Sequence, residues 1–290
     1  MCGSKYKKNT RIDGKIVIIT GANAGLGFAN AVDYASRGGK IYMACRDKKR
    51  GGDALIEIKK QSGSENVHFL QLDLASLESV REFVKKFQEQ EKKLDILVNN
   101  AGIYGAAKSF TKDGFELQMG VNHLGHFLLT NLLLDMLKKS TQGRIVVVSS
   151  MAHTWGKLEH DNFMNEKSSS QGKVYGNTKL ANVLFARELA KKLEGTNVTV
   201  NSCHPGMVRT EIQREVNIVV QSILFGSLYL LIKSPMEGAQ TQIRLGIDPN
   251  LSNVSGKYFA DCKEKKPSKR GEDDETAKWL WNKSVEMVKL

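Results

Sequence analysis

Short apolar runs alternate along this chain with longer amphipathic stretches, and this alternation limits the fold more than any other feature. The amphipathic stretches, such as residues 76–94, carry apolar residues at intervals of three and four with charged residues between them. The apolar runs predict strands at 15–20, 41–45, 67–73, 94–102, 144–150, 197–206 and 256–260. Strands that are apolar on both faces and alternate with helices form a parallel sheet covered on both sides. We therefore expect an α/β fold with one doubly wound, Rossmann-type parallel sheet of about seven strands.

No internal repeat, low-complexity tract or linker divides the 290 residues. A chain of this length suits one large domain or two small ones, and the uninterrupted pattern favours one. We predict a single domain over residues 13–290, preceded by a polar, disordered N-terminal tail over residues 1–12. The tail lacks the apolar core of a secretory signal or a membrane anchor.

Lysine and arginine outnumber aspartate and glutamate, which gives the chain a formal net charge of +12. A positive surface of this kind favours phosphorylated ligands, anionic lipid surfaces or nucleic acid. The most charged segment, 262–275, mixes acids with bases and lacks interleaved aromatic residues, so we predict no nucleic-acid partner. We expect this segment to be a solvated loop before a C-terminal helix.

The cysteines and histidines indicate neither a disulfide framework nor a metal site. The four cysteines are widely scattered without C-x-x-C spacing, and the six histidines include no H-x-x-x-H pair. Few, scattered cysteines are typical of a reducing compartment. We therefore predict a cytoplasmic protein that binds no metal.

The segment TGANAGLG (20–27) follows the first predicted strand and opens a helix. Its G-x-x-x-G-x-G spacing differs from the commoner dinucleotide fingerprint, but the physics is the same. Gly21 permits a tight turn, Gly25 lets the backbone approach a pyrophosphate, and Gly27 lets the helix pack on the strand. The backbone N–H groups and the positive helix end can then hold phosphates, so we predict a dinucleotide-binding loop.

Tyr175 and Lys179 lie four residues apart in a predicted helix, which places them on one face. A phenol has an ordinary pKa near 10, and a positive charge beside it favours the phenolate. The pair can therefore be a tuned acid, but Y-x-x-x-K is common by chance. Taken alone, the two residues are more simply explained as a solvated surface pair.

Six segments taken together change that interpretation: TGANAGLG, NNAG (99–102), VNHLGHF (121–127), VVVSS (146–150), YGNTK (175–179) and HPGMVRT (204–210). In order and approximate spacing they resemble the short-chain dehydrogenase/reductase family, over about residues 13–260. Finer wording, such as SSMAH (149–153), resembles its retinol dehydrogenase branch. The resemblance implies an oxidoreductase that moves a hydride between a nicotinamide coenzyme and a carbonyl or alcohol carbon.

The resemblance assigns four catalytic positions. Tyr175 becomes the group that exchanges a proton with the substrate oxygen, and Lys179 lowers its pKa and binds the nicotinamide ribose. Ser150, rather than Ser149, matches the serine that hydrogen-bonds the substrate oxygen, although the residues alone suggest a strand-end or helix-capping serine. Asn122 matches the position that holds a water beside the lysine, and we expect the two histidines of VNHLGHF to be packing residues.

The resemblance also assigns the coenzyme contacts. Asp73 is expected to accept from the adenine amino group, residues 100–102 to line the adenosine–ribose channel, and residues 205–210 to face the nicotinamide carboxamide. From the residues alone, the asparagine pair 99–100 can simply be a turn that ends a strand. The assigned positions are Gly21, Asn23, Ala24, Gly25, Leu26, Gly27, Arg46, Asp73, Leu74, Asn100, Ala101, Gly102, Tyr175, Lys179, Pro205, Gly206, Val208 and Thr210.

The end of the second predicted strand favours NADP(H) over NAD(H). An acid there binds the ribose 2′-hydroxyl of NAD, whereas a cation accommodates the 2′-phosphate of NADP. This chain has Ala44 where the family's NAD-selecting acid would lie, and Arg46, whose planar fork suits phosphate, follows. Asp47 argues against this choice, and we expect it to cap the next helix instead.

The apolar run 216–235 is interrupted by polar residues and can be interpreted in three ways. A membrane span is least favoured because the run is short, and a buried core helix comes second. We favour a lid, near residues 211–235, that shapes an apolar substrate pocket. A lipophilic substrate follows: retinal or retinol first, aliphatic or lipid-derived aldehydes second, with a catalytically idle coenzyme-binding scaffold as the other class.

Two partner predictions complete this view of the chain. An apolar lid and a net positive charge together suggest peripheral attachment to an anionic membrane surface. Many proteins of the family pair through the helices that carry Asn122 and Tyr175, so the resemblance keeps a homodimer open.

Overall fold

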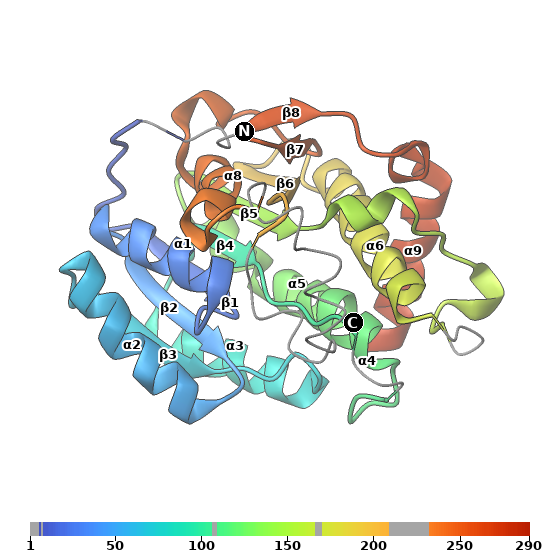
Figure 1. Ribbon diagram of the computed structural model, residues 1–290, viewed down its shortest axis with the longest axis horizontal. Coiled ribbons are helices and arrows are strands. Elements are labelled where there is room, and N and C mark those ends of the chain that lie inside the picture. Colours follow the sequence, from blue (N-terminus) through green and yellow to red (C-terminus); the bar gives the residue numbers. More distant parts are fainter. Residues whose placement is uncertain (1–5, 7, 106–108, 166–169, 209–231) are drawn as a thin grey trace.

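The computed structural model describes residues 6, 8–105, 109–165, 170–208 and 232–290. Its centre is an eight-stranded sheet in the order β3-β2-β1-β4-β5-β6-β7-β8 (Figure 1). All neighbours pair in parallel except β7 and β8, which are antiparallel. The strands are β1 (Ile16–Thr20), β2 (Lys40–Cys45), β3 (Val67–Gln71), β4 (Ile96–Asn99), β5 (Gly143–Val148), β6 (Val198–His204), β7 (Tyr258–Ala260) and β8 (Lys263–Lys265). The predicted doubly wound α/β fold is confirmed.

One face of the sheet is covered by α1 (Gly25–Ser36), α2 (Lys48–Ser62) and α8 (Pro235–Ile247). Burial on both faces of the sheet explains why the first four residues of β1 are all apolar. Val17 and Ile19 pack with these helices, and the alternate side chains of the strand pack in the opposite layer. Burial of each such side chain stabilises the fold by about 1.5–3 kcal/mol, so both layers depend on this strand.

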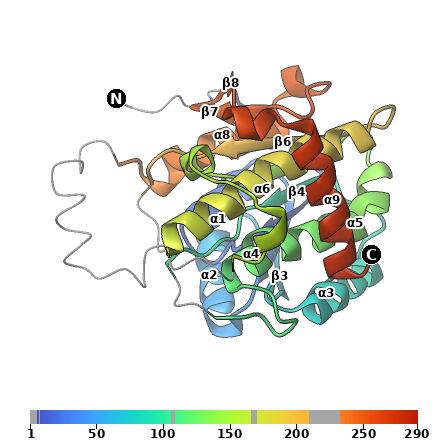
Figure 2. The same ribbon diagram turned by 90° about the vertical axis from the view of Figure 1, so that its right-hand side faces the viewer.

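The other face is covered by α3 (Leu77–Gln90), α5 (Gly125–Lys138) and α6 (Gln171–Lys192), with the short α4 (Leu117–Met119) near the start of α5. The C-terminal helix α9 (Asp274–Val288) lies alongside α6 in both views (Figures 1 and 2). The sheet is therefore buried between two helical layers, and α9 adds a further helix outside one of them.

Helix α9 packs tightly on α5 and α6. The ring centre of Trp281 lies 4.9 Å from that of Phe127 in α5 and 6.1 Å from that of Phe185 in α6. Ser284 Oγ lies 2.8 Å from Nε2 of His123, which is buried at the start of the α5 region. Faces of α5 and α6 are thus covered by the chain's own last helix.

The eighth strand was not predicted. β8 forms within segment 262–275, which the sequence predicts as a solvated loop, and the same segment also contains a 3-10 helix, η7 (Lys269–Glu272). All three residues of β8 are exposed and charged, so no apolar alternation marks them. Their pairing with β7 depends on backbone hydrogen bonds that the side-chain pattern does not reveal.

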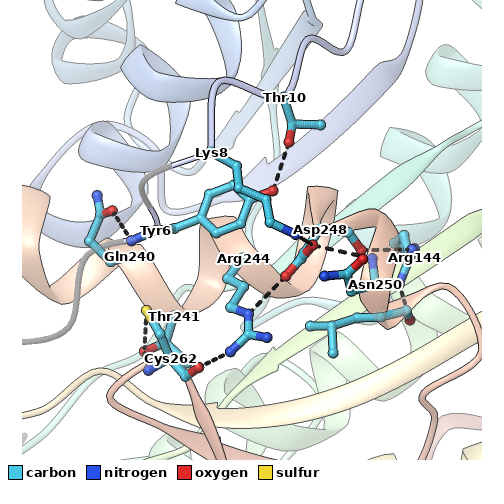
Figure 3. Close-up of polar contacts among 11 residues, drawn as sticks. Tyr6, Lys8, Thr10, Arg144, Gln240, Thr241, Arg244, Asp248, Asn250 and Cys262 are labelled. Carbon is cyan, nitrogen blue, oxygen red and sulfur yellow. Dashed lines mark hydrogen bonds and ion pairs between the residues drawn. The ribbon is translucent and has the colours of Figure 1, made fainter.

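The described part of the N-terminal segment packs on the domain, in contrast to the expected disordered tail (Figure 3). Tyr6 is buried, and its N–H donates to Gln240 Oε1 at 3.0 Å. Lys8 Nζ pairs with the buried carboxylate of Asp248 at 3.0 Å, and Arg244 Nε binds the same carboxylate at 3.0 Å. One aromatic ring and one lysine thus attach a polar segment to α8.

The chain order in the sheet reverses between β1 and β4, where doubly wound sheets bind ligands at the carboxyl ends of their strands. The motifs at 20–27, 99–102, 146–150 and 204–210 all begin at or just before the ends of β1, β4, β5 and β6. Because these strands are parallel, their motifs meet at one edge of the sheet.

Candidate active site

The glycine turn after β1 has a backbone that favours glycine at two positions and requires it at a third. Gly21 and Gly25 have φ angles of +67° and +56°, in the left-handed region. A Cβ at Gly27 would lie 2.4 Å from the Gly21 carbonyl oxygen and 2.6 Å from Asn100 Nδ2. The tight turn and the close helix packing expected from the spacing are present, and coenzyme binding remains a prediction.

The first turn of α1 fits the phosphates of a dinucleotide. Its N-cap, Ala24, provides no side-chain acceptor, and the turn contains no acidic residue. By contrast, α2, α3, α6, α8 and α9 each begin with an Asp or Ser whose side chain accepts from the first turn. The N-cap therefore leaves the N–H groups in the first turn of α1 for another acceptor, next to the partly exposed Asn23 and Leu26.

Thr20, the last residue of β1, connects the glycine turn to the end of β4. Its Oγ1 accepts from the N–H groups of Asn100 and Ala101, both at 2.9 Å, and its carbonyl accepts from Asn100 Nδ2 at 2.8 Å. Asn100 Oδ1 is buried without a partner among the described residues, which leaves it free to accept from a ligand. This role of Thr20 could not be predicted from the sequence, because its partners lie 80 and 81 positions away.

His126 extends this network toward Asn122. Its Nε2 lies 2.9 Å from Thr20 Oγ1, and its Nδ1 lies 3.2 Å from the Asn122 carbonyl oxygen. Burial lowers the pKa of His126 to about 4, so the ring is neutral at physiological pH. A neutral, buried ring agrees with the expected packing role and adds two polar contacts to it.

Asn122 lies in a single π-helical turn, η1 (Gly120–Leu124), of a type that is frequent at functional sites. Its Oδ1 accepts from the Ile103 N–H at 2.8 Å, and its Nδ2 donates to the Ile103 carbonyl at 3.1 Å. Nδ2 also donates to Thr178 Oγ1 in α6 at 3.0 Å. The amide therefore fixes the chain after β4 against the helix that carries Tyr175.

Ser150 and Tyr175 meet just beyond the end of β5. Burial raises the pKa of the Tyr175 phenol to about 12, and a hydrogen bond with the Ser150 hydroxyl acts in the opposite direction. Ser150 Oγ also accepts from the Ala152 N–H at 3.2 Å, so the capping role suggested by the residues alone coexists with this contact. The neighbouring Ser149 differs, because its Oγ donates to the Lys179 carbonyl at 2.7 Å.

Lys179 lies one turn beyond Tyr175, and its side chain is buried. Nζ donates to the Val148 carbonyl at 3.2 Å and lies 5.5 Å from the centre of the Tyr175 ring. A Cβ at Gly102 would lie 3.4 Å from this Nζ and 3.3 Å from Asn122 Oδ1, so the lysine and the asparagine are near neighbours. Burial lowers the pKa of Lys179 to about 8.

The structure thus brings the four predicted catalytic residues together, with one difference from expectation. The sequence predicts that Lys179 lowers the pKa of Tyr175. Within the protein, burial has the larger effect and raises that pKa, with Ser150 as the group that lowers it. The four-residue spacing of Tyr175 and Lys179 could be seen in the sequence, whereas the burial of the Tyr175 hydroxyl could not.

The end of β2 has the arrangement expected for a phosphate-binding arginine. Ala44 is buried within the strand, and Arg46 follows it with an exposed side chain. Asp47 Oδ1 accepts from the Arg50 N–H at 2.9 Å, which confirms the predicted helix cap. Asp47 therefore has a structural task of its own, which weakens the argument against NADP(H).

Asp73 and Leu74, which follow β3, differ in how much they can offer a coenzyme. Asp73 is partly exposed, and its Oδ1 accepts from the Ala75 N–H at 3.0 Å. The Leu74 side chain is buried in the core, where it packs closely beside Gly125 of α5. Only the backbone of Leu74 can therefore contribute to the predicted contact.

The turn after β6 is held by a lysine from the last residues of the predicted lid. Gly206 has a φ angle of +94°, and Val208 pairs with Lys233 through a single β-bridge. Lys233 Nζ donates to the Pro205 carbonyl at 3.4 Å and pairs with Asp261 at 2.5 Å. The turn that is predicted to face the carboxamide is thus held in place by Lys233, which is itself paired with Asp261.

Thr210 and residues 211–231 of the predicted lid lie outside the described residues. The last positions assigned to the lid lead into α8, which begins with a capping box between Ser234 and Glu237. A Cβ at Gly238 in this helix would lie 2.5 Å from Val208 and 2.8 Å from Leu26. The start of α8 therefore brings the glycine loop and the turn after β6 into contact.

Exposed apolar side chains lie in the segments that follow β5 and β6. Met151 is 49% exposed and Trp155 53% exposed after the serine pair, and Met207 is 39% exposed after β6. The Tyr104 ring packs edge-on against Tyr175, with 5.0 Å between ring centres. Apolar groups at this sheet edge suit an apolar substrate. Tyr104 and Trp155 could not be predicted as site residues, because single aromatic residues in loops have no periodicity.

Comparison with known proteins identifies the family of this chain. The family model for short chain dehydrogenases matches residues 15–219. Among curated proteins, Retinol dehydrogenase 14 of Homo sapiens is 45% identical over 292 residues, covering 96% of this chain and 87% of that protein. Retinol dehydrogenase 12 of Homo sapiens is 45% identical over 286 residues, covering 99% of this chain and 90% of that protein.

Solved structures show the same architecture. An uncharacterised protein from Mycobacterium paratuberculosis is 31% identical with a TM-score of 0.80, covering 99% of this chain and 98% of that chain. A short-chain type dehydrogenase/reductase from Mycobacterium marinum shares the fold at 23% identity and a TM-score of 0.71, covering 86% and 94% of the two chains. From its motifs, its fold and these matches, the chain belongs to the short-chain dehydrogenase/reductase family, in the retinol dehydrogenase branch.

Proposed function

We propose that this oxidoreductase transfers a hydride between NADP(H) and a lipophilic carbonyl or alcohol of the retinal/retinol type. The observation that carries the proposal is the grouping of three side chains beyond the end of β5: Lys179 Nζ lies 5.5 Å from the centre of the Tyr175 ring, and Ser150 is near enough to lower the pKa of the phenol. Two adjacent hydroxyls can hold one substrate oxygen between them, and the ammonium group stabilises negative charge on the phenol.

The protein's own groups then have separate tasks. The bound nicotinamide supplies the hydride in reduction and accepts it in oxidation. Ser150 donates a hydrogen bond to the substrate oxygen, and Tyr175 gives that oxygen its proton. Because burial raises the pKa of Tyr175 to about 12, the phenol is held in its acid form, which suits carbonyl reduction. Lys179 is charged at pH 7 because its pKa is about 8, so it can stabilise the tyrosinate that forms.

The choice of NADP(H) rests on the end of β2. Arg46 is exposed after the strand, Ala44 offers no carboxylate, and Asp47 is engaged as a helix cap. A guanidinium group binds a phosphate through two parallel hydrogen bonds, and it binds a single ribose hydroxyl less strongly. The same residues would fit NAD(H) less well.

The substrate class rests on the exposed apolar side chains near Tyr175 and on the names of the 45% identical relatives, which are retinol dehydrogenases. Aliphatic or lipid-derived aldehydes are the alternative substrates, since an apolar surface does not distinguish chain from ring. An idle coenzyme-binding scaffold is disfavoured because Ser150, Tyr175 and Lys179 are not only present but adjacent.

The test is Tyr175→Phe, which removes one oxygen. Loss of a general acid lowers kcat by roughly 10²–10⁴-fold, and we expect NADPH to bind the variant with little change. Retinal and a series of aliphatic aldehydes should be assayed with NADPH and NADH in parallel, and NADPH binding followed by fluorescence. A variant that reduces carbonyls at the wild-type rate would refute the assignment of Tyr175, and a wild-type protein that binds NADPH without turnover would favour the scaffold.

Membrane contact and a homodimer remain proposals with their own tests. No helix in the described part of the chain has both the length and the hydrophobicity needed to cross a bilayer. Flotation with acidic liposomes at low salt measures peripheral attachment, and complete absence of binding would dismiss it. Since α9 covers faces of α5 and α6, a homodimer through these helices would have to include α9, and sedimentation would detect it.

A further inference from the structure

One histidine connects the turn that carries Ser150 to the C-terminal segment. After β5 the chain continues as a short 3-10 helix, η2 (Met151–Thr154). His153 Nδ1 lies 2.7 Å from the Ser150 carbonyl oxygen, and its Nε2 lies 3.1 Å from the backbone nitrogen of Ser268. Ser268 comes 115 positions later in the chain, so this contact closes a long loop onto the site.

The two contacts define the state of the ring. A carbonyl oxygen only accepts, so Nδ1 carries the hydrogen and donates it to Ser150. A backbone N–H only donates, so Nε2 presents its lone pair to Ser268. His153 is buried, and burial lowers its pKa, which keeps the ring neutral at physiological pH. A neutral ring in one tautomer therefore links the position of Ser268 to the backbone of Ser150.

The segment around Ser268 is itself firmly attached. Its Oγ caps η7 by accepting from the Gly271 N–H at 3.3 Å. A Cβ at Gly271 would lie 3.1 Å from Val183 of α6, so η7 packs directly on that helix. Arg270 Nη1 donates to the Gly156 carbonyl at 3.1 Å, just beyond the end of η2. The segment thus contacts both the serine turn and the helix that carries Tyr175.

We propose that His153 and Ser268 are positioning residues that set the distance between the hydroxyl groups of Ser150 and Tyr175. The inference rests on the proposed function, because it requires that Ser150 and Tyr175 act on one substrate oxygen. Loss of the link lets the serine turn move relative to α6, which lowers kcat by roughly ten- to hundredfold. Coenzyme affinity changes little, because the glycine turn follows β1 and makes none of these contacts.

The sharpest test deletes one N–H. Ser268 has a φ angle of −63°, which proline adopts without strain, so Ser268→Pro removes the donor to His153 while keeping the backbone path. Ser268→Ala is the matched control, since it loses the same hydroxyl and keeps the N–H. We expect a roughly tenfold or larger fall in kcat for Ser268→Pro relative to Ser268→Ala, with the NADPH Kd of both close to wild type.

A second pair of variants tests the same link from the histidine. His153→Phe removes both contacts, whereas the amide oxygen of His153→Gln can reach the place of Nε2 and accept from Ser268. We expect Gln to restore much of the kcat that Phe loses, at equal thermal stability and equal NADPH Kd. Because one link is being broken, His153→Phe with Ser268→Pro should be no slower than His153→Phe alone.

Ser150→Ala distinguishes failure of the role proposed for Ser150 from failure of the positioning role proposed for His153 and Ser268. If Ser150→Ala keeps the wild-type kcat, the role that the proposed function gives to Ser150 fails and the positioning role fails with it. If Ser150→Ala is slow while Ser268→Pro and Ser268→Ala have equal kcat, the positioning role alone is refuted. Additive losses in the double variant, or no rescue by glutamine, would refute it as well, and the comparison of His153→Gln with His153→Phe does not depend on the folding of the proline variant.

Discussion

Around the glycine turn the backbone forms the proposed coenzyme site: Gly21 and Gly25 adopt positive φ angles, and the N-cap of α1, Ala24, offers no side-chain acceptor to the first N–H groups of the helix. Around Tyr175, in contrast, side chains form the site, and burial shifts the pKa values of both Tyr175 and Lys179. We call the glycine turn with Arg46 the coenzyme half, and Ser150, Tyr175 and Lys179 the reaction half. Coenzyme affinity should therefore be sensitive to added side-chain volume and to surface charge in the coenzyme half. Stability should depend on pH through the reaction half.

The largest effect is expected from Gly27→Ala. Its Cβ would lie 2.4 Å from a backbone oxygen, so α1 must move away from the turn that it helps to form. We expect a stability loss of about 1–3 kcal/mol and at least a tenfold rise in the NADPH Kd. Unfolding in urea and fluorescence titration with NADPH measure the two effects.

Gly52→Ala is the matched control for this substitution. Gly52 also lies in a helix, α2, and a Cβ there would meet nothing within 4 Å. We expect a gain of up to about 1 kcal/mol in stability and unchanged coenzyme binding. Equal behaviour of the two alanine variants would show that the coenzyme half is not built by the backbone.

Arg46→Ala tests the one side chain of the coenzyme half that is assigned to selectivity. Loss of a charge-assisted contact to phosphate costs about 1.5–3 kcal/mol, so the NADPH Kd should rise roughly ten- to hundredfold. The NADH Kd should not change, because NADH has no 2′-phosphate. Lys49→Ala, in which the charge removed is also exposed, is the control. A parallel loss for NADPH and NADH would contradict the assignment.

Lys179→Met tests the reaction half through stability. The pKa of Lys179 falls from 10.5 to about 8 on folding, because its charge is buried. Below pH 8 Lys179 is charged in both the folded and the unfolded state, so folding has to bury the charge and stability is reduced. Between pH 8 and 10.5 the lysine is neutral in the folded state and still charged in the unfolded state, so the folded state binds fewer protons. Wild-type stability should therefore rise with pH through this window. At pH 7 we expect the inactive Met variant to be more stable by about 1–3 kcal/mol.

The control for that experiment is Lys49→Met, whose side chain is exposed in the native protein. Urea unfolding at pH 7, 8, 9 and 10 should show the gap between wild type and Lys179→Met closing with pH, and no such trend for Lys49→Met. A gap that stays constant, or a Met variant that is less stable at pH 7, would show that burial of this charge is not costly.

The smallest effects are expected at the helix starts that distinguish α1 from α2. Asp47→Ala removes a cap from α2 and should cost about 1 kcal/mol without changing NADPH binding. Ala24→Asp adds the missing cap to α1 and should stabilise the protein by a similar amount, about 1 kcal/mol. The added carboxylate should also weaken NADPH binding. A variant with tighter binding would overturn the view that α1 is kept open for phosphate.

Local features of the site could be predicted from the sequence, because their causes are local. A glycine turn after a strand, a lysine one helical turn beyond a tyrosine, and Asp47 as a cap each depend on residues within a few positions of one another. The central strands were predicted for the same reason, since burial on both faces leaves a continuous apolar run such as that of β1.

Features that depend on distant pairs could not be predicted. Thr20 meets Asn100, and His153 meets Ser268, across separations of 80 and 115 positions. Strand β8 has only charged side chains, so nothing in its pattern distinguishes it from a loop. The pKa of Tyr175 depends on how deeply its hydroxyl lies, which follows from packing across several elements.

Helix α9 also decides what a shortened form of this protein would be. Trp281 covers Phe127 and Phe185, and Ser284 Oγ lies within hydrogen-bond distance of Nε2 of the buried His123. A chain cut before Asp274 would present two aromatic rings to water and would lose this contact to His123. Such a fragment would be prone to aggregation, so a shortened form of the protein should keep the last seventeen positions.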